Sequence, residues 1–386
     1  MKLERKVVPF FKPSIDDNDI SAVVDILKSG WLSMGEKTIL FEKKFCELIG
    51  SKNCIAVNSG TSALHIILDA MGIGAGDEVV IPANTFIATA EAVEYVGAKP
   101  VLADIDRKTF NISIESLKEN ISSKTKAIIP VHIAGQSCEM DEILELASEN
   151  NLKVVDDAAH SLPTKYKGKF IGTISDASAF SFYATKPLMT GEGGMVTTEN
   201  DDLAEIIRLK RLHGINKDAW NRYSDKGKWE YDVKTLGYKY NPTDIASAMG
   251  LSQLEKFELL NRQRKDIAER YSMNFRDCKL LEIPYITDYS THSWHLYIVK
   301  LRTELLRINR DTVIEKLIEN GIHPSVHFIP IYRFSFYKDD LTVDMFPNTE
   351  YNFQRIISLP VYPSLAGEDV DYVSDVLIDI LRNNLK

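Results

Sequence analysis

The sequence has little cysteine, no excess of positive charge and no long apolar run. Its four cysteines, Cys46, Cys54, Cys138 and Cys278, form no C-x-x-C pair, so neither a disulfide framework nor a zinc knuckle is expected. The net charge of −9 argues against a general nucleic-acid binder, because no surplus of basic residues can neutralise phosphates. No apolar run approaches the ~20 residues of a membrane span. Since its charged start lacks a secretion signal, the chain is expected in the cytoplasm.

The pattern of apolar residues after residue 53 indicates a wound α/β sheet. Short runs rich in Val and Ile alternate with helical stretches: strands are expected over 54–58, 78–82, 100–104, 127–132 and 153–157, and helices over 61–70, 88–96 and 141–150. Strands that are apolar on both faces and joined by helices form mostly parallel sheets. Ligands bind beyond the carboxyl ends of such strands, where Asn58, Ser59, Asp157 and His160 stand here.

The remaining segments predict an N-terminal arm and a second, smaller domain. Helices are expected from about residue 16 to Gly30 and over 38–49. A long helix over 242–273 leads to an α+β segment, with expected strands over 295–301 and 325–329 and helices over 310–320 and 368–383. Because 386 residues suffice for two domains, the division is placed between residues 1–245 and 246–386.

One lysine stands between an apolar run and a glycine-rich turn, in Ser181-Phe-Tyr-Ala-Thr-Lys186-Pro-Leu-Met-Thr-Gly191-Glu-Gly-Gly194. An amine held in a cleft loses hydration, its pKa falls, and it becomes a nucleophile near neutral pH. The pattern is therefore typical of a Schiff-base lysine. Taken alone, however, such a lysine is more often a solvated surface residue.

Three further segments follow strands and offer partners for a ligand. Asn58-Ser-Gly60-Thr61-Ser62 opens a helix, so it forms either an anion site or an ordinary N-cap. Asp156-Asp157-Ala-Ala-His160 ends a strand, where neighbouring carboxylates point to opposite faces and only one need meet the ligand. Phe86 is placed either to stack on a flat ring or to pack in the core.

Two histidine pairs, His292 with His295 and His323 with His327, have spacings that raise the question of a metal. Pro324 argues against a helix between the second pair, and no glutamate follows His323. No metal site is expected.

In their order along the chain, these motifs resemble one family, the DegT/DnrJ/EryC1/StrS nucleotide-sugar aminotransferases. The resemblance extends from Gly30-Trp-Leu-Ser to Ile357-Ser-Leu-Pro-Val-Tyr-Pro and includes Gly237-Tyr-Lys-Tyr-Asn241. It implies the aspartate aminotransferase fold (type I) with pyridoxal 5′-phosphate (PLP) as the cofactor. The large domain would carry the mostly parallel sheet, and the smaller C-terminal domain would be α+β.

The resemblance also implies roles for individual residues. Lys186 would form the Schiff base and move protons between the substrate carbon and C4′ of PLP. Asp157 would pair with the pyridinium nitrogen, His160 would lie near the ring hydroxyl, and Phe86 would stack on the ring.

The phosphate of PLP would be held from both subunits of a homodimer. Gly60, Thr61 and Ser181 would bind it, with Ser62 in the same turn. Asn241 would reach the phosphate of the neighbouring subunit, which implies shared active sites. Contacts to the sugar substrate are placed at Trp31, Ser33, Trp220 and His327.

Relatives take the amino group from L-glutamate and pass it to a keto-sugar, in the synthesis of lipopolysaccharides or other glycans. Gly-Glu-Gly-Gly and Gly-Tyr-Lys-Tyr-Asn resemble the members that act at C4, so a UDP- or dTDP-linked 4-keto-6-deoxy sugar is the expected acceptor. The alternatives are amination at C3 and a catalytically silent binder of sugar nucleotides. A nicotinamide-dependent oxidoreductase is disfavoured, because no G-x-G-x-x-G turn follows the first strand.

Overall fold

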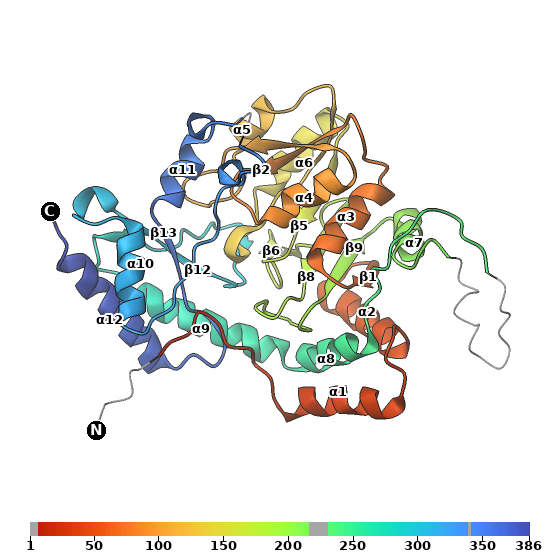
Figure 1. Ribbon diagram of the computed structural model, residues 1–386, viewed down its shortest axis with the longest axis horizontal. Coiled ribbons are helices and arrows are strands. Elements are labelled where there is room, and N and C mark those ends of the chain that lie inside the picture. The colour runs from red at the N-terminus through yellow and green to blue at the C-terminus, as the bar shows by residue number, and fades with distance from the viewer. Residues whose placement is uncertain (1–6, 216–230, 339–340) are drawn as a thin grey trace.

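Seven strands form the central sheet of the computed structural model, which describes residues 7–215, 231–338 and 341–386 (Figure 1). The strand order is β1-β9-β8-β5-β4-β2-β3. Neighbours from β8 to β3 run parallel, whereas β9 pairs antiparallel with both β1 and β8. The mostly parallel sheet predicted from the sequence is confirmed. Its strands are β1 (Asn53–Val57), β2 (Glu78–Pro82), β3 (Lys99–Ala103), β4 (Thr125–Ile128), β5 (Lys153–Asp157), β8 (Ala177–Ser181) and β9 (Gly194–Thr198).

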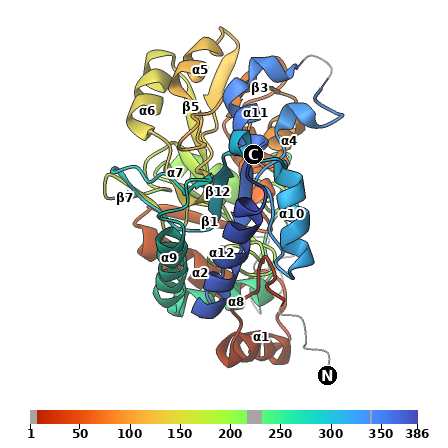
Figure 2. The same cartoon turned by 90° about the vertical axis from the view of Figure 1, so that its left-hand side faces the viewer.

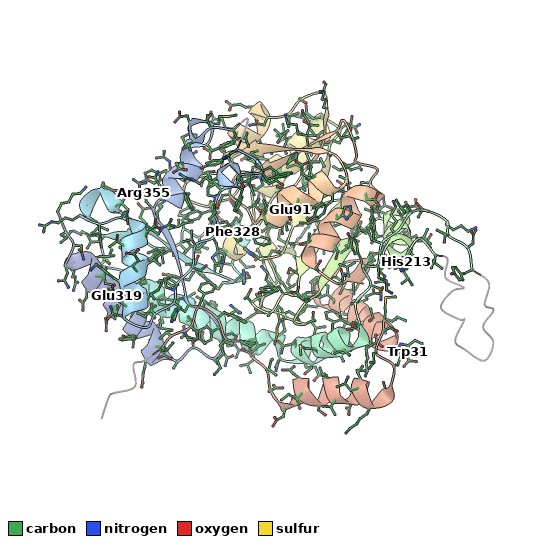
Figure 3. The ribbon with its side chains drawn as sticks, viewed as in Figure 1. Trp31, Glu91, His213, Glu319, Phe328 and Arg355 are labelled. Atoms are coloured by element: carbon green, nitrogen blue, oxygen red, sulfur yellow. The ribbon has the colours of Figure 1, made fainter. Side chains whose placement is uncertain are left out.

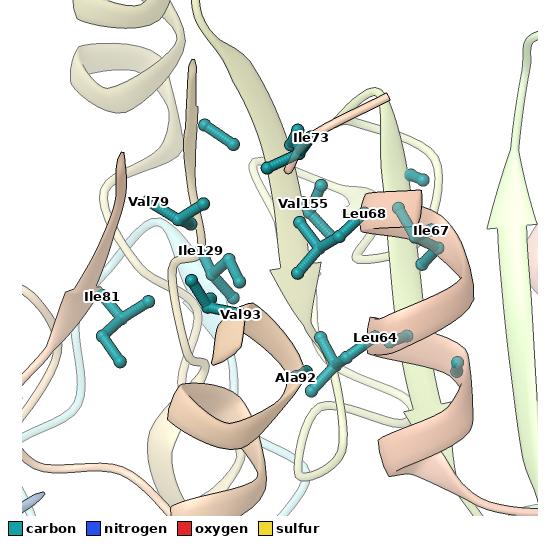
Figure 4. Packing of buried hydrophobic residues seen from close by; sticks show 14 of the residues in the cluster. Leu64, Ile67, Leu68, Ile73, Val79, Ile81, Ala92, Val93, Ile129 and Val155 are labelled. Atoms are coloured by element: carbon teal, nitrogen blue, oxygen red, sulfur yellow. The ribbon is translucent and has the colours of Figure 1, made fainter. Parts of the chain in front are cut away.

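Helices cover both faces of this sheet, so successive residues of one strand enter different cores. In β2, Val79 packs with the helices of one face, whereas Val80 packs with those of the other. Figure 4 shows the first core, where Leu68 lies against Val155 and Leu64 lies beside Ala92. Burial on both faces explains why the strands read as nearly continuous apolar runs. The first face carries α3 (Gly60–Ala70), α4 (Ile87–Tyr95) and α7 (Asp201–Lys210); the second carries α2 (Glu36–Ile49), α5 (Ile114–Glu119) and α6 (Met140–Glu149).

A separate core in the C-terminal part surrounds an antiparallel sheet with the order β10-β12-β13. The strand expected over 325–329 is wrong, because only Ser325 pairs, in an isolated bridge with Ser358. The chain then leaves this sheet, and β13 is the strand that pairs with β12. Helices α9 (Phe257–Asn274), α10 and α12 pack around this part (Figure 2). The elements are β10 (Leu281–Glu282), β12 (Tyr297–Leu301), β13 (Ile356–Leu359), α10 (Arg310–Glu319), α11 (Pro347–Phe353) and α12 (Gly367–Arg382).

Two helices, α8 (Asp244–Glu255) and α9 (Phe257–Asn274), replace the single helix predicted over 242–273. Lys256 between them has φ −108° and ψ 7°, and its ammonium lies 2.7 Å from Asp16 and 2.5 Å from Asp19. No glycine or proline marks this break. The two N-terminal helices, α1 (Asp17–Ser29) and α2, end at left-handed glycines as predicted. The division after residue 245 falls in the first turn of α8 and stays a prediction.

Short elements complete the described chain. The strands β11 (Ser290–Thr291), β6 (Lys165–Tyr166) and β7 (Lys169–Phe170) pair in that order and join the two parts. The 3₁₀ turns are η1 (Ile133–Gly135), η3 (Thr303–Leu305), η4 (Ile331–Arg333) and η5 (Val343–Met345). In the three described stretches, no helix has the length and apolarity that a bilayer crossing requires.

Candidate active site

A cavity of about 470 Å³ lies beyond the carboxyl ends of β1, β5 and β8, where the wound sheet predicts a ligand. Phe328, one of its lining residues, lies near the middle of the molecule in Figure 3. The residues predicted from the sequence that line it are Gly60, Thr61, Phe86, Asp157, His160, Ser181, Lys186 and His327. Convergence of polar groups from distant segments on one concave surface marks a candidate active site.

Lys186 projects into this cavity from the loop after β8. Its backbone N–H donates to the carbonyl of Tyr183 (2.9 Å), which makes a tight turn at the lysine. Burial lowers the pKa of its ammonium to about 8, although the carboxylate of Asp157 favours the charged form. The amine is therefore partly neutral near physiological pH and can act as a nucleophile or a base.

Asp157, the last residue of β5, faces the cavity with a fixed carboxylate. The hydroxyl of Thr89 donates to Oδ2 (2.8 Å), and the backbone N–H of Ala159 donates to Oδ1 (3.1 Å). Burial raises the pKa of this carboxyl. Asp156 turns to the other face, where it accepts hydrogen bonds from two serine hydroxyls. Asp157 thus faces the cavity and Asp156 faces the core, as the alternation of side chains along a strand predicts.

His160 is a neutral imidazole with an assignable tautomer. The backbone N–H of Ala134 donates to its Nδ1 (3.3 Å), so the proton of the neutral ring is on Nε2. Burial lowers the pKa of His160 well below its usual range, and the nearby charge of Lys186 lowers it further. In the neutral form the ring offers one N–H donor, Nε2–H.

The first turn of α3 provides an anion site at one side of the cavity. Ser59 is the N-cap, and its hydroxyl accepts a hydrogen bond from the N–H of Ser62 (3.0 Å). The hydroxyl of Ser62 completes the capping box, so Ser62 supports the turn and does not line the cavity. The first N–H groups of a helix lack intrahelical acceptors, and they bind anions well. Gly60 and Thr61 present this turn to the cavity.

Two glycines bring this turn close to the strands that carry the lysine loop. A Cβ on Gly60 would lie 2.9 Å from the Cβ of Ser181. A Cβ on Gly194 would collide with the carbonyl of Ser59. The Gly-Glu-Gly-Gly segment thus does more than bend the chain: its last glycine allows β9 to pack against the anion-binding turn.

Phe86 offers an aromatic surface at the cavity. It precedes α4 and is 56% exposed, which is unusual for phenylalanine unless a partner covers it. The ring of Phe328 lies 5.8 Å from Phe86 and stacks on His160 at 5.7 Å. The exposed ring of Phe86 is suited to stack on a flat ligand.

Several lining or supporting residues were missed by the sequence reasoning. Thr89 follows Phe86 by three residues, and that helical spacing could have marked it as facing the same site. The sequence places His295 at the start of an expected strand and in a possible metal-binding pair, and Phe328 within another expected strand, so neither is indicated as a lining residue. Glu192 also lines the cavity. Glu192, His295 and Phe328 come from different segments of the fold, so local spacing gives no signal that they converge on this cavity.

Other predicted site residues lie apart from this cavity. Trp31 lines a different cavity of about 1310 Å³, formed by α1, α2, α7 and the segments beside them. Ser33 forms an isolated bridge with Thr243. Asn241 donates from Nδ2 to the carbonyl of Pro242 (3.1 Å), and its buried Oδ1 has no partner among the described residues. Trp220 lies outside the described residues.

The groups around the cavity fit PLP. The phosphate requires the amides of a helix start, which Gly60 and Thr61 supply, and the pyridine nitrogen requires a carboxylate, which Asp157 supplies. The aldehyde requires a partly neutral amine, which is Lys186, and the ring requires an aromatic surface, which is Phe86.

Comparisons with known proteins agree with this fit. The profile of the DegT/DnrJ/EryC1/StrS aminotransferase family matches residues 13–378. SpsC, a spore coat polysaccharide biosynthesis protein of Bacillus subtilis, is 44% identical over 97% of both chains.

Two solved structures share the fold over nearly the whole chain. The PLP form of the sugar aminotransferase Spr1654 of Streptococcus pneumoniae is 32% identical, with TM-score 0.92, over 99% of this chain and 100% of that one. PseC of Helicobacter pylori, an aminotransferase involved in the biosynthesis of pseudoaminic acid, is 31% identical, with TM-score 0.91, over 98% and 100%. The predicted type I fold and PLP cofactor are thus confirmed, and the chain belongs to the DegT/DnrJ/EryC1/StrS family of sugar aminotransferases.

Proposed function

We propose that this enzyme transfers the amino group of L-glutamate to a UDP- or dTDP-linked 4-keto-6-deoxy sugar. The products would be 2-oxoglutarate and a 4-amino sugar nucleotide, made in the cytoplasm for a lipopolysaccharide or another glycan. The observation that carries the chemistry is the placement of Lys186 and Asp157 on one cavity, beside the anion site of α3. The Gly191-Glu-Gly-Gly194 segment supports C4 over C3.

Each residue has a defined task in this proposal. PLP, when bound, acts as an electron sink for the carbon that loses or gains the amino group. Lys186, partly neutral because its pKa is about 8, takes and returns the proton of the reacting carbon. Asp157 holds the ring nitrogen, and His160 presents Nε2–H to the ring hydroxyl. Phe86 covers one face of the ring and limits the access of water.

A homodimer with shared sites is the second part of the proposal. Asn241 does not line the cavity of its own chain, and its Oδ1 is buried without a partner in the described residues. Trp31 lies with other exposed apolar side chains, which a second copy would cover.

Mixed dimers test the sharing. When Lys186→Ala and Asn241→Ala chains are unfolded and refolded together, half of the dimers carry both. If Asn241 acts across the interface, each mixed dimer keeps one intact site, and roughly a quarter of wild-type activity returns. If Asn241 acts within its own chain, no intact site forms and no activity returns.

The reaction itself is tested in two steps. Borohydride reduction of the PLP-loaded protein should fix the cofactor on the peptide that contains Lys186, and label on another lysine would refute that assignment. A panel of 3-keto and 4-keto sugar nucleotides, offered with L-glutamate, then decides the position. Amination of 3-keto sugars alone would exclude C4, and no reaction with glutamate would favour a silent binding protein.

A further inference from the structure

His295 lies against the amine of Lys186. Its Nε2 is 3.4 Å from Nζ, although the two residues are 109 positions apart in the chain. The ring is 5% exposed, lines the cavity, and stands just before β12. The centroids of the His160 and His295 rings lie 4.4 Å apart, with an angle of 50° between the ring planes.

The second nitrogen of His295 has no partner. Nδ1 is buried and makes no hydrogen bond with any described residue. Burial lowers the pKa of His295 well below its usual range, and the charge of Lys186 lowers it further, so the ring carries one proton. That proton is on Nδ1 or on Nε2, and the choice decides which partner donates to the other.

The two arrangements differ in cost. With the proton on Nδ1, a buried N–H would lack an acceptor, and Lys186 would have to donate to Nε2. With the proton on Nε2, the lone pair of Nδ1 is left without a donor, and Nε2–H donates to the amine of Lys186. Orphaned N–H groups are rarer in proteins than under-used acceptors, so the second arrangement is favoured. An amine that accepts this hydrogen bond must be unprotonated.

Other charged groups near Lys186 differ in their effect on the pKa of its amine. The carboxylate of Asp157 favours the ammonium, whereas burial and the guanidinium of Arg264 disfavour it. His160 and His327 are neutral, because burial and Lys186 lower their pKa values. Glu192 lines the same cavity. Among these groups, only His295 lies within hydrogen-bond distance of Nζ.

We propose that His295 is a positioning residue for Lys186: its Nε2–H donates to the ε-amine, favours the unprotonated form of that amine and directs it into the cavity. The proposal rests on the assignment of Lys186 as the reactive amine. It gives His295 no direct contact with a substrate. Its effect is to keep Lys186 ready to accept a proton whenever the amine is free.

A pair of variants of similar length tests this role. His295→Met removes the donor, whereas His295→Gln keeps an amide N–H at similar reach. The full chain, freed of cofactor, is acetylated with trace anhydride over a pH series, and the labelled peptide that contains Lys186 is measured by mass spectrometry. The Met variant should raise the apparent pKa of Lys186 by up to about one unit, and the Gln variant should stay near wild type.

The sign of the shift makes the test decisive. Methionine adds apolar surroundings, which alone would lower the pKa of the lysine, so a rise that the Gln variant does not share comes from the lost donor. A lower or unchanged value in the Met variant would overturn the proposal, and so would a Gln variant that shifts as Met does. If the Met variant does not fold, His295→Asn, whose amide is too short to reach Nζ, replaces it. Borohydride labelling of the wild type tests Lys186 independently.

Discussion

Two cavities of this enzyme, the one beside Trp31 and the candidate active site, differ in chemistry as well as in size. The larger one, about 1310 Å³, has mostly apolar walls from α1, α2 and α7. Of its charged residues, Arg211 pairs with Glu42, and Asp244 accepts hydrogen bonds from the backbone of α2 and the residue before it. The smaller one, about 470 Å³, brings a lysine, an aspartate and three histidines to one place. Volume therefore does not locate the reaction; convergent polar groups with shifted pKa values do.

Lys186→Ala should give the largest effect and define the smaller cavity as the active site. Loss of the amine removes the base and the attachment point together, so activity should fall by roughly 10⁴-fold or more. The measurement is product formation from glutamate and a keto-sugar nucleotide. Lys165→Ala, on the short strand β6, is the matched control and should retain activity. Equal loss in both variants would argue for a folding defect.

Asp157→Asn should come next, because an amide cannot keep the pyridine nitrogen protonated. The turnover rate should fall on the order of 100-fold, while the protein remains folded. The matched variant is Asp156→Asn, which removes a carboxylate of the core face with its serine partners. It should lower the melting temperature and leave turnover nearly intact. Reversed outcomes would mean that the two carboxylates are misassigned.

The pH dependence of the reaction rate should reflect the protonation of Lys186. Only unprotonated Lys186 takes a proton, so below its pKa of about 8 the rate of the glutamate half-reaction should fall with decreasing pH, by about tenfold per unit. Stopped-flow absorbance on the PLP-loaded enzyme measures this limb. A rate independent of pH between about 6 and 8 would show that the amine is neutral throughout, or that another step limits the reaction.

A substitution in the larger cavity should weaken the association of two chains and should change the turnover rate least of all these variants. Ile206→Asp places a charge in its apolar wall, and the dissociation constant of the proposed dimer should rise by roughly 10-fold or more. Light scattering over a dilution series measures it. Ile283→Asp, an exposed isoleucine outside this cavity, is the control. A stable dimer in the Ile206 variant would place the interface elsewhere.

The sequence predicted the sheet well because its strands are buried on both faces and its helices begin and end at recognisable caps. Gly30 and Gly50 end α1 and α2 as expected. The sequence did not predict the elements whose ends or pairing depend on contacts between distant residues. Lys256 leaves the helical conformation while paired with two aspartates of the first helix region, and β13 rather than 325–329 pairs with β12.

The candidate site shows the same limit. Lys186, Asp157 and Gly60 stand in local motifs that carry their own chemistry, so the sequence could indicate them. His295 gains its meaning only from a contact between residues 109 positions apart. Without the fold, such a histidine has the appearance of any buried aromatic residue.

The lysine loop closes a hairpin between β8 and β9, in which Ser181 stands directly opposite Gly194. Inside it, the N–H of Phe182 donates to Gly193 and the N–H of Thr190 donates to Phe182, at 2.8 and 2.9 Å. Opening this loop requires breaking bonds next to the central sheet. The amide hydrogens of Phe182 and Thr190 should therefore exchange with solvent nearly as slowly as those of the strands, and far more slowly than those of an ordinary surface loop. The reactive amine would then keep its place through the whole catalytic cycle.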